Sequence, residues 1–121
     1  MFNFEKLEVW RKSVDFADFV YRLTQAFPVE ERFGITNQMR RASVSISSNV
    51  AEGTSRSSKL DYSRFVELAA GSLFEVVSQA HIAVRQTYLS DENLQSMHAS
   101  AEELSRMLSG LKSYLGKDST G

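Results

Sequence analysis

Apolar residues recur every three or four positions in four segments of the chain, a spacing typical of amphipathic α-helices. The first segment runs from about Leu7 to Phe27, and Pro28 ends it because proline cannot continue the helical hydrogen bonds. Two adjacent stripes predict one broad buried face: Trp10, Val14, Ala17 and Tyr21, and beside them Val9, Phe16, Val20, Leu23 and Phe27. Phe19 falls instead among the charged residues of the opposite side.

A narrower apolar stripe predicts a second helix over residues 36–53, with Thr36 as its N-cap and Gly53 at its end. The serines around this stripe lower the helix propensity of the segment, so we expect it to depend on packing against its neighbours. The stripe is Ile35, Met39, Ala42, Ile46 and Val50, and the serines are Ser43, Ser45, Ser47 and Ser48.

The third helix is predicted over residues 59–88. Ser58, followed three residues later by Asp61, resembles a capping box and places the start of the helix. Its apolar face again has two stripes, and Phe74 lies just beyond the edge of that face. The stripes are Phe65, Ala69, Ser72, Val76, Ala80 and Ala83, and Val66, Ala70, Leu73, Val77 and Val84.

The fourth helix is predicted over residues 91–115, with Ser90 or Asp91 as its cap and Gly116 as its end. Its apolar residues alternate strictly at spacings of three and four, which predicts a seam like that of a coiled coil. The seam is Leu94, Met97, Ala101, Leu104, Leu108, Leu111 and Leu115.

Four helices joined by short connections predict an all-α fold, an antiparallel up-down-up-down four-helix bundle that occupies residues 1–121 as one domain. The chain has no cysteine, which excludes disulfides and thiolate metal sites. With 14 basic and 15 acidic residues, the chain as a whole has no electrostatic preference for nucleic acid. Because neither a signal peptide nor a long apolar run is present, we expect a cytoplasmic protein that does not associate with a membrane.

No catalytic or metal-binding pattern in the sequence meets the spacing that its chemistry requires. A di-iron bundle needs Glu-x-x-His pairs, whereas Ser78 precedes His81 and Gln95 precedes His98 at that distance. Residues 53–59 lack the spacing of a phosphate-binding loop, and no nucleophile elbow occurs. We therefore predict that the protein is not an enzyme and has no metal site and no cofactor. Both histidines are interpreted as ordinary surface residues.

One stretch of the chain is locally basic. Positions 40–64 hold five basic residues and only two acidic ones, a local net charge of +3 in a chain of −1. Arg56 and Lys59 flank the start of the third helix, where free backbone N–H groups favour anions. The functional interpretation is a nucleic-acid-binding patch of Arg40, Arg41, Arg56 and Lys59. The alternative is an internal ion pair for Arg41 and solvated charges elsewhere.

A polar row, Gln38, Arg41, Ser45, Asn49 and Glu52, follows the flank of the second helix, and Glu75 and Gln79 lie near the buried face of the third. A carboxylate close to a core must be paired. We therefore expect Arg41 or Arg40 to pair with Glu52 or Glu75. We interpret Arg41, Asn49, Glu52 and Glu75 as a structural polar network rather than as catalytic groups.

The run from Arg40 to Gly53 resembles the signature of the four-helix-bundle proteins known as 23S rRNA intervening-sequence proteins. Ordered matches extend over most of the chain, and only the fourth helix lacks one. They are residues 7–10, 21–24, 27–28, 33–36 and 70–75.

The resemblance implies a bundle that associates as a homopentameric ring with a central opening. Some relatives are encoded inside insertions in ribosomal RNA genes. In a related branch, strongly basic accessory proteins of retroelements bind nucleic acid and a reverse transcriptase, whereas this chain has a pI near 6.1. The implied function is a non-catalytic, pentameric scaffold that binds RNA or an RNA-handling protein. The alternative is a protein-binding adaptor with no role in nucleic-acid binding.

Phe19 and Phe74 have no use in a monomeric bundle, because each lies beside an apolar face that is already broad. Aromatic residues in such places are typical of subunit interfaces. A ring requires two different surfaces on every subunit, and we expect the first and third helices to supply them.

Overall fold

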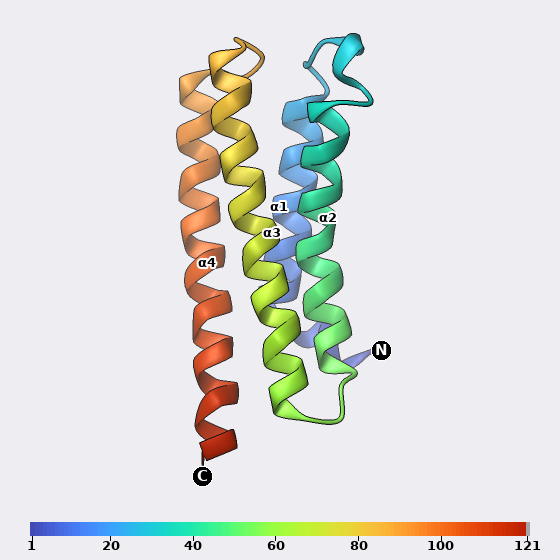
Figure 1. The fold of residues 1–121 in the computed structure, drawn as a ribbon, viewed down its shortest axis with the longest axis vertical. Helices are drawn as coiled ribbons and strands as arrows, with labels where there is room; N and C mark the ends of the chain where they lie inside the picture. Colours follow the sequence, from blue (N-terminus) through green and yellow to red (C-terminus); the bar gives the residue numbers. More distant parts are fainter. Residues whose placement is uncertain (121) are drawn as a thin grey trace.

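The computed structural model of the chain describes residues 1–120, and the side chains of residues 1–117. Within this range the chain forms four α-helices and no strand, which confirms the predicted all-α bundle. The helices are α1 (Glu8–Thr24), α2 (Ile35–Thr54), α3 (Lys59–Arg85) and α4 (Asp91–Thr120), and two 3-10 turns are η1 (Asn3–Lys6) and η2 (Val29–Glu31). Figure 1 shows successive helices running in opposite directions.

Each helix packs against two others, and together they enclose one core. α2 and α4 both contact α1 and α3, so α1 and α3 occupy diagonal corners of the bundle. Apolar side chains from the four helices fill the centre, where full burial of each contributes about 1.5–3 kcal/mol. The largest buried ones are Met39, Ile46, Leu73, Met97, Leu104 and Leu108. The last three belong to the predicted seam of α4.

Two of the predicted helix starts are confirmed by their caps. The Ser58 hydroxyl accepts a hydrogen bond from the Asp61 backbone N–H at 3.1 Å. The Ser90 hydroxyl accepts one from the Asn93 N–H at 3.0 Å. Each bond satisfies a backbone donor that has no partner inside its helix.

The predicted start of α2 is wrong by one residue. Gly34, rather than Thr36, precedes the helix as its N-cap, and Thr36 is buried in the first turn. The N-cap therefore lies two residues earlier than the capping preference of threonine indicated.

Three predicted helix ends are also wrong. α1 ends at Thr24, before Phe27, and Pro28 instead precedes η2. α3 ends at Arg85, and Thr87 adopts the left-handed conformation at φ 65° that commonly terminates a helix. α4 continues past Gly116, because a single glycine weakens a helix without ending it.

The predicted buried face of α1 is too broad. Val14 and Tyr21 are each 40% exposed, because α2 and α4 cover only part of the apolar surface of α1. Phe19, expected on the charged side, is half-buried and packs against the core. It does so because it lies on the side of α1 that faces α4, with Phe16 and Leu104.

Candidate nucleic-acid interface and docking surfaces

Arg40 connects two helices of the bundle. It is half-buried, and its Nε donates to the Thr24 hydroxyl at 2.9 Å. Its guanidinium carbon lies 4.6 Å from the centre of the Tyr21 ring, and Nη2 donates to the Tyr21 carbonyl at 3.4 Å. A guanidinium engaged in this way holds the end of α1 against α2.

Arg56 and Lys59 lie at the opposite end of α2, around the turn into α3 at the bottom of Figure 1. The Arg56 guanidinium lies over the Phe65 ring at 4.6 Å, and its Nη2 is 3.9 Å from the Glu52 carboxylate. The Lys59 ammonium lies 5.9 Å from the centre of the Tyr114 ring. Both side chains are exposed, so these contacts leave part of each cation open to solvent.

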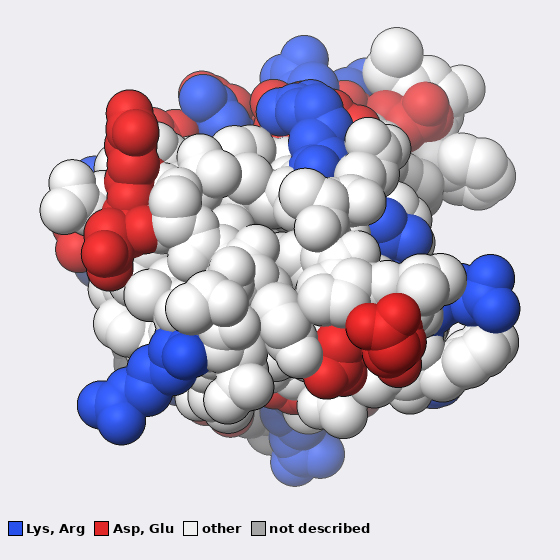
Figure 2. All heavy atoms as spheres, turned by 90° about the horizontal axis from the view of Figure 1, so that it is seen from above, with Lys and Arg blue, Asp and Glu red and all other residues white. Residues whose placement is uncertain are grey.

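The structure does not bring the four predicted basic residues together. Arg40 and Arg41 precede the end of α2 by about 20 Å, at 1.5 Å of rise per residue, whereas Arg56 and Lys59 follow it. Arg41 is exposed and lines a groove between α2 and α3. Figure 2 shows the bundle from above, at the end opposite Arg56 and Lys59, where basic and acidic side chains are intermixed around an uncharged centre. The role of these residues in nucleic-acid binding stays a prediction.

The polar contact between α2 and α3 is made by two serines, and of the four residues of the predicted network only Asn49 bonds to one of them. The Ser45 and Ser72 hydroxyls lie 2.9 Å apart across the two helices. Asn49 Nδ2 donates to the Ser45 carbonyl at 2.8 Å and to the Ser45 hydroxyl at 3.0 Å. Gln79 Nε2 donates to Glu75 at 3.1 Å.

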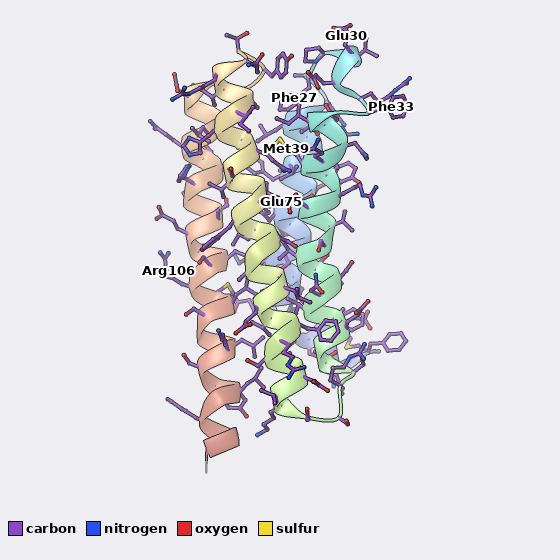
Figure 3. The ribbon with its side chains drawn as sticks, in the orientation of Figure 1. Phe27, Glu30, Phe33, Met39, Glu75 and Arg106 are labelled. Atoms are coloured by element: carbon purple, nitrogen blue, oxygen red, sulfur yellow. The ribbon has the colours of Figure 1, made fainter. Side chains whose placement is uncertain are left out.

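The expected ion pair of Arg41 or Arg40 with Glu52 or Glu75 is not formed among the described residues. Glu52 faces Arg56, and Glu75 accepts from Gln79. Arg41 and Glu75 do line the same open groove, of about 330 Å³. Arg41 and Glu75 are both exposed, so water solvates their charges and neither side chain requires an ion-pair partner. Glu75 is labelled on α3 in Figure 3.

The outward side of α3 carries four large apolar residues that are exposed to solvent. Phe74, in the middle of the helix, is 66% exposed, and three more large apolar residues are exposed along the same helix. They are Leu60, Leu68 and Ile82. Phe74 also separates two hollows in the groove between α3 and α4, with volumes of about 370 and 270 Å³. Leu73, Val77 and Ala101 line the larger hollow.

Phe19 belongs to a different surface from Phe74. It lines a hollow of about 260 Å³ between α1 and α4, together with Lys12 and Glu103. The Arg22 guanidinium lies 5.8 Å from the centre of its ring. The two predicted interface residues therefore mark two separate faces of the bundle.

Two exposed ion pairs connect α4 to its neighbours. Lys12 Nζ lies 3.2 Å from Glu103, and Lys112 Nζ lies 2.5 Å from Glu67. The hydrogen bond to Glu103 raises the pKa of Lys12, and the hydrogen bond from Lys112 lowers the pKa of the Glu67 carboxyl. Because all four groups are exposed to solvent, these pairs contribute little to stability.

The two histidines of the chain meet between α3 and α4. His81 Nε2 and His98 Nε2 are 2.9 Å apart, and the two rings are almost perpendicular at 88°. Periodicity within one helix does not reveal this pair, because its members are 17 residues apart on two helices. Among the described residues, no three or more potential ligands of a metal ion are grouped together.

These features define a four-helix bundle that exposes apolar residues on α3. The family model described as 23S rRNA-intervening sequence protein matches residues 5–110. The chain therefore belongs to the 23S rRNA-intervening sequence protein family, as the resemblance in the sequence predicted. No described helix is both long enough and apolar enough to cross a lipid bilayer.

A solved structure has the same fold. It is the crystal structure of a protein of unknown function from the S23 ribosomal protein family of Bacteroides thetaiotaomicron. The TM-score is 0.80 at 23% sequence identity, over 87% of this chain and 95% of that one. At this identity the similarity shows the fold alone. A comparison with curated proteins finds no match.

Proposed function

We propose that the protein is a non-catalytic scaffold, a homopentameric ring of bundles that holds an RNA or an RNA-handling protein. The observation that carries this proposal is the exposed apolar face of α3, with Phe74 at its centre. An apolar ridge of this kind is stabilised when another protein surface removes it from water. A second copy of the chain is the partner that is always present at matching concentration.

The position of α1 supports a ring rather than a two-fold dimer. In a ring, each subunit contacts its two neighbours through two different surfaces. α1 lies diagonally opposite α3, and its outward side exposes Val14 and Tyr21. When α3 of one copy packs against α1 of the next, each copy at the end of the chain of subunits still has one contact surface free. Further copies therefore add until the ring closes.

Size-exclusion chromatography with light scattering tests this proposal. For a pentamer at micromolar concentration we expect a mass of about 68 kDa, five times the 13.6 kDa of one chain. Phe74→Asp places a charge in the centre of the proposed contact, and we expect it to yield monomers that remain helical by circular dichroism.

Phe33→Asp is the matched control for Phe74→Asp. Phe33 is exposed too, but it lies beside η2 and extends away from the bundle (Figure 3). We expect this variant to keep the mass of the unmodified protein. A stable monomer of the unmodified protein, or an equal loss of assembly in both variants, contradicts the proposed ring and its α3 contact.

The turn between α2 and α3 is the part of each bundle that we assign to RNA. Arg56 and Lys59 lie there beside the start of α3, where the backbone N–H groups and the helix dipole favour phosphate. In a cyclic ring all five copies of this turn lie on the same side, and several weak contacts then act together. Salt-insensitive binding of a polypeptide, without RNA binding, would instead support the adaptor function.

A further inference from the structure

The groove between α3 and α4 holds a pair of imidazole rings that neither the fold nor the proposed scaffold requires. His81 is exposed and His98 is half-buried, and their Nε2 atoms face each other at 2.9 Å. At this distance one nitrogen carries a proton and the other accepts it. A hydrogen bond between exposed side chains stabilises the bundle little, so packing alone does not explain the arrangement.

We propose that His81 and His98 form a binding site for a divalent transition-metal ion such as Zn²⁺, Ni²⁺ or Cu²⁺. Zinc–imidazole bonds are about 2.0–2.1 Å long, so two histidines on a tetrahedral ion have nitrogens about 3.3–3.4 Å apart. The present separation must open by about half an ångström, which small side-chain rotations provide. An ion then replaces the shared proton, and both imidazoles keep their remaining proton on Nδ1.

The bundle orients both ligands before the ion arrives. Leu73 and Val76 of α3 and Met97 and Ala101 of α4 are buried in the core, which holds the two helices in register. The ligands therefore lose little conformational freedom on binding. Imidazole selects zinc, nickel and copper, whereas Mg²⁺ and Ca²⁺ prefer oxygen ligands.

Glu102 supplies the negative charge nearest to this pair on α4. It follows His98 by one helical turn and lines the adjacent hollow together with it. Its negative charge favours a bound cation, and water fills the remaining coordination positions. Arg85 follows His81 by one turn on α3, and its positive charge repels a bound cation. With two protein ligands the site binds reversibly and does not hold a permanent structural ion.

Calorimetric titration of the protein without a histidine tag tests the proposal, because the chain has no histidines other than these two. With Zn²⁺ or Ni²⁺ near pH 7.5 we expect one ion per chain. At a tenfold excess over the dissociation constant we expect Tm to rise by about 5 °C. Mg²⁺, which prefers oxygen ligands, is expected to have no effect.

His81→Gln and His98→Gln are each expected to abolish the response to zinc, and Glu102→Gln to weaken the affinity several-fold. In the unmodified protein, Zn²⁺ should shift the imidazole C–H resonances of both histidines in the NMR spectrum, a result that does not depend on any variant folding. Unchanged resonances together with an unchanged Tm would show a hydrogen-bonded pair only. Binding that survives both histidine substitutions would also overturn the site. Neither result bears on the proposed ring, which light scattering tests separately.

Discussion

At the scale of single residues, Gly53 determines how closely α2 approaches α3. It is buried, and a Cβ built on it lies 2.7 Å from Tyr62 Cδ1 and 3.2 Å from Phe65 Cβ. Contacts between carbon atoms this short are repulsive, so only a residue without a side chain fits here. The resulting burial also raises the pKa of the Tyr62 phenol.

Gly53→Ala is therefore expected to lower the free energy of unfolding by roughly 1–3 kcal/mol, through overpacking against Tyr62. Gly110→Ala is the matched control, because Gly110 lies in α4 with no atom within 4 Å of an added Cβ. There the gain in helix propensity should stabilise the protein by about 0.5–1 kcal/mol. Denaturant unfolding at one protein concentration measures both, and equal signs for the two substitutions would contradict the packing described.

At the scale of elements, Tyr88 ties together the connections at one end of the bundle. Its phenol donates to Glu31 of η2 at 3.1 Å, and its ring centre lies 5.7 Å from that of Phe27. The connection between α3 and α4 is thereby attached to the connection between α1 and α2, 57 residues away. The helices at this end are joined by contacts between loops as well as through the core.

This contact predicts a dependence of stability on alkaline pH. The hydrogen bond to Glu31 raises the pKa of Tyr88 above its ordinary value of 10.0. Below pH 10 the phenol is protonated in both the folded and the unfolded chain, so the hydrogen bond to Glu31 makes its full contribution to stability. As the pH rises further, Tyr88 loses its proton first in the unfolded chain. The stabilising contribution of the hydrogen bond is then lost as the pH passes the pKa of Tyr88 in the folded chain.

Tyr88→Phe should lower Tm by a few degrees at neutral pH. It should also make the additional fall of Tm above pH 10 smaller than in the unmodified protein. Tyr114→Phe removes a phenol from an exposed ring on α4 and serves as the control for general alkaline effects. Thermal unfolding followed by circular dichroism between pH 7 and 11 compares the three proteins. If the difference between Tyr88→Phe and the unmodified protein is the same at every pH, the Tyr88–Glu31 bond is not responsible.

At the scale of the whole molecule, the distribution of charge limits where a polyanion can bind. The chain has a net charge of −1, and the end of the bundle shown in Figure 2 mixes both signs. Affinity for RNA then depends on a few local cations repeated around the ring, not on a field that covers the whole protein. Arg40, one of the four basic residues predicted from the sequence to bind nucleic acid, donates from its guanidinium to Thr24 and Tyr21 of α1.

Arg56→Ala combined with Lys59→Ala should reduce the affinity for a structured RNA at least tenfold. We expect the slope of log affinity against log salt to decrease as well, because fewer counterions are released. Arg85→Ala combined with Arg106→Ala removes the same charge elsewhere on α3 and α4, and Figure 3 shows Arg106 pointing away from the bundle. Fluorescence anisotropy at several salt concentrations compares the variants. Negligible affinity at low salt, or equal losses in both double variants, would reject the proposed contact.

Local chemistry explains why much of the fold is predictable from the sequence. The periodic seam of α4 identifies its buried side without reference to any other helix, since the period of the helix is set by backbone geometry. The side chains of the caps Ser58 and Ser90 bond to backbone groups three residues away, so the residues next to them in the sequence are enough to identify them. The exposed position of Phe74 also follows from its place just beyond the apolar face.

Other properties depend on how the helices are rotated against one another, and no local pattern encodes that rotation. Tertiary packing placed Phe19 against the core and left Val14 exposed, because α2 and α4 cover only part of α1. It also joined Arg40 of α2 to Thr24 of α1. The sequence by itself determined that there are four helices, the caps Ser58 and Ser90, and the family. The contact between His81 and His98 was decided by the tertiary structure alone, because it joins residues on two separate helices.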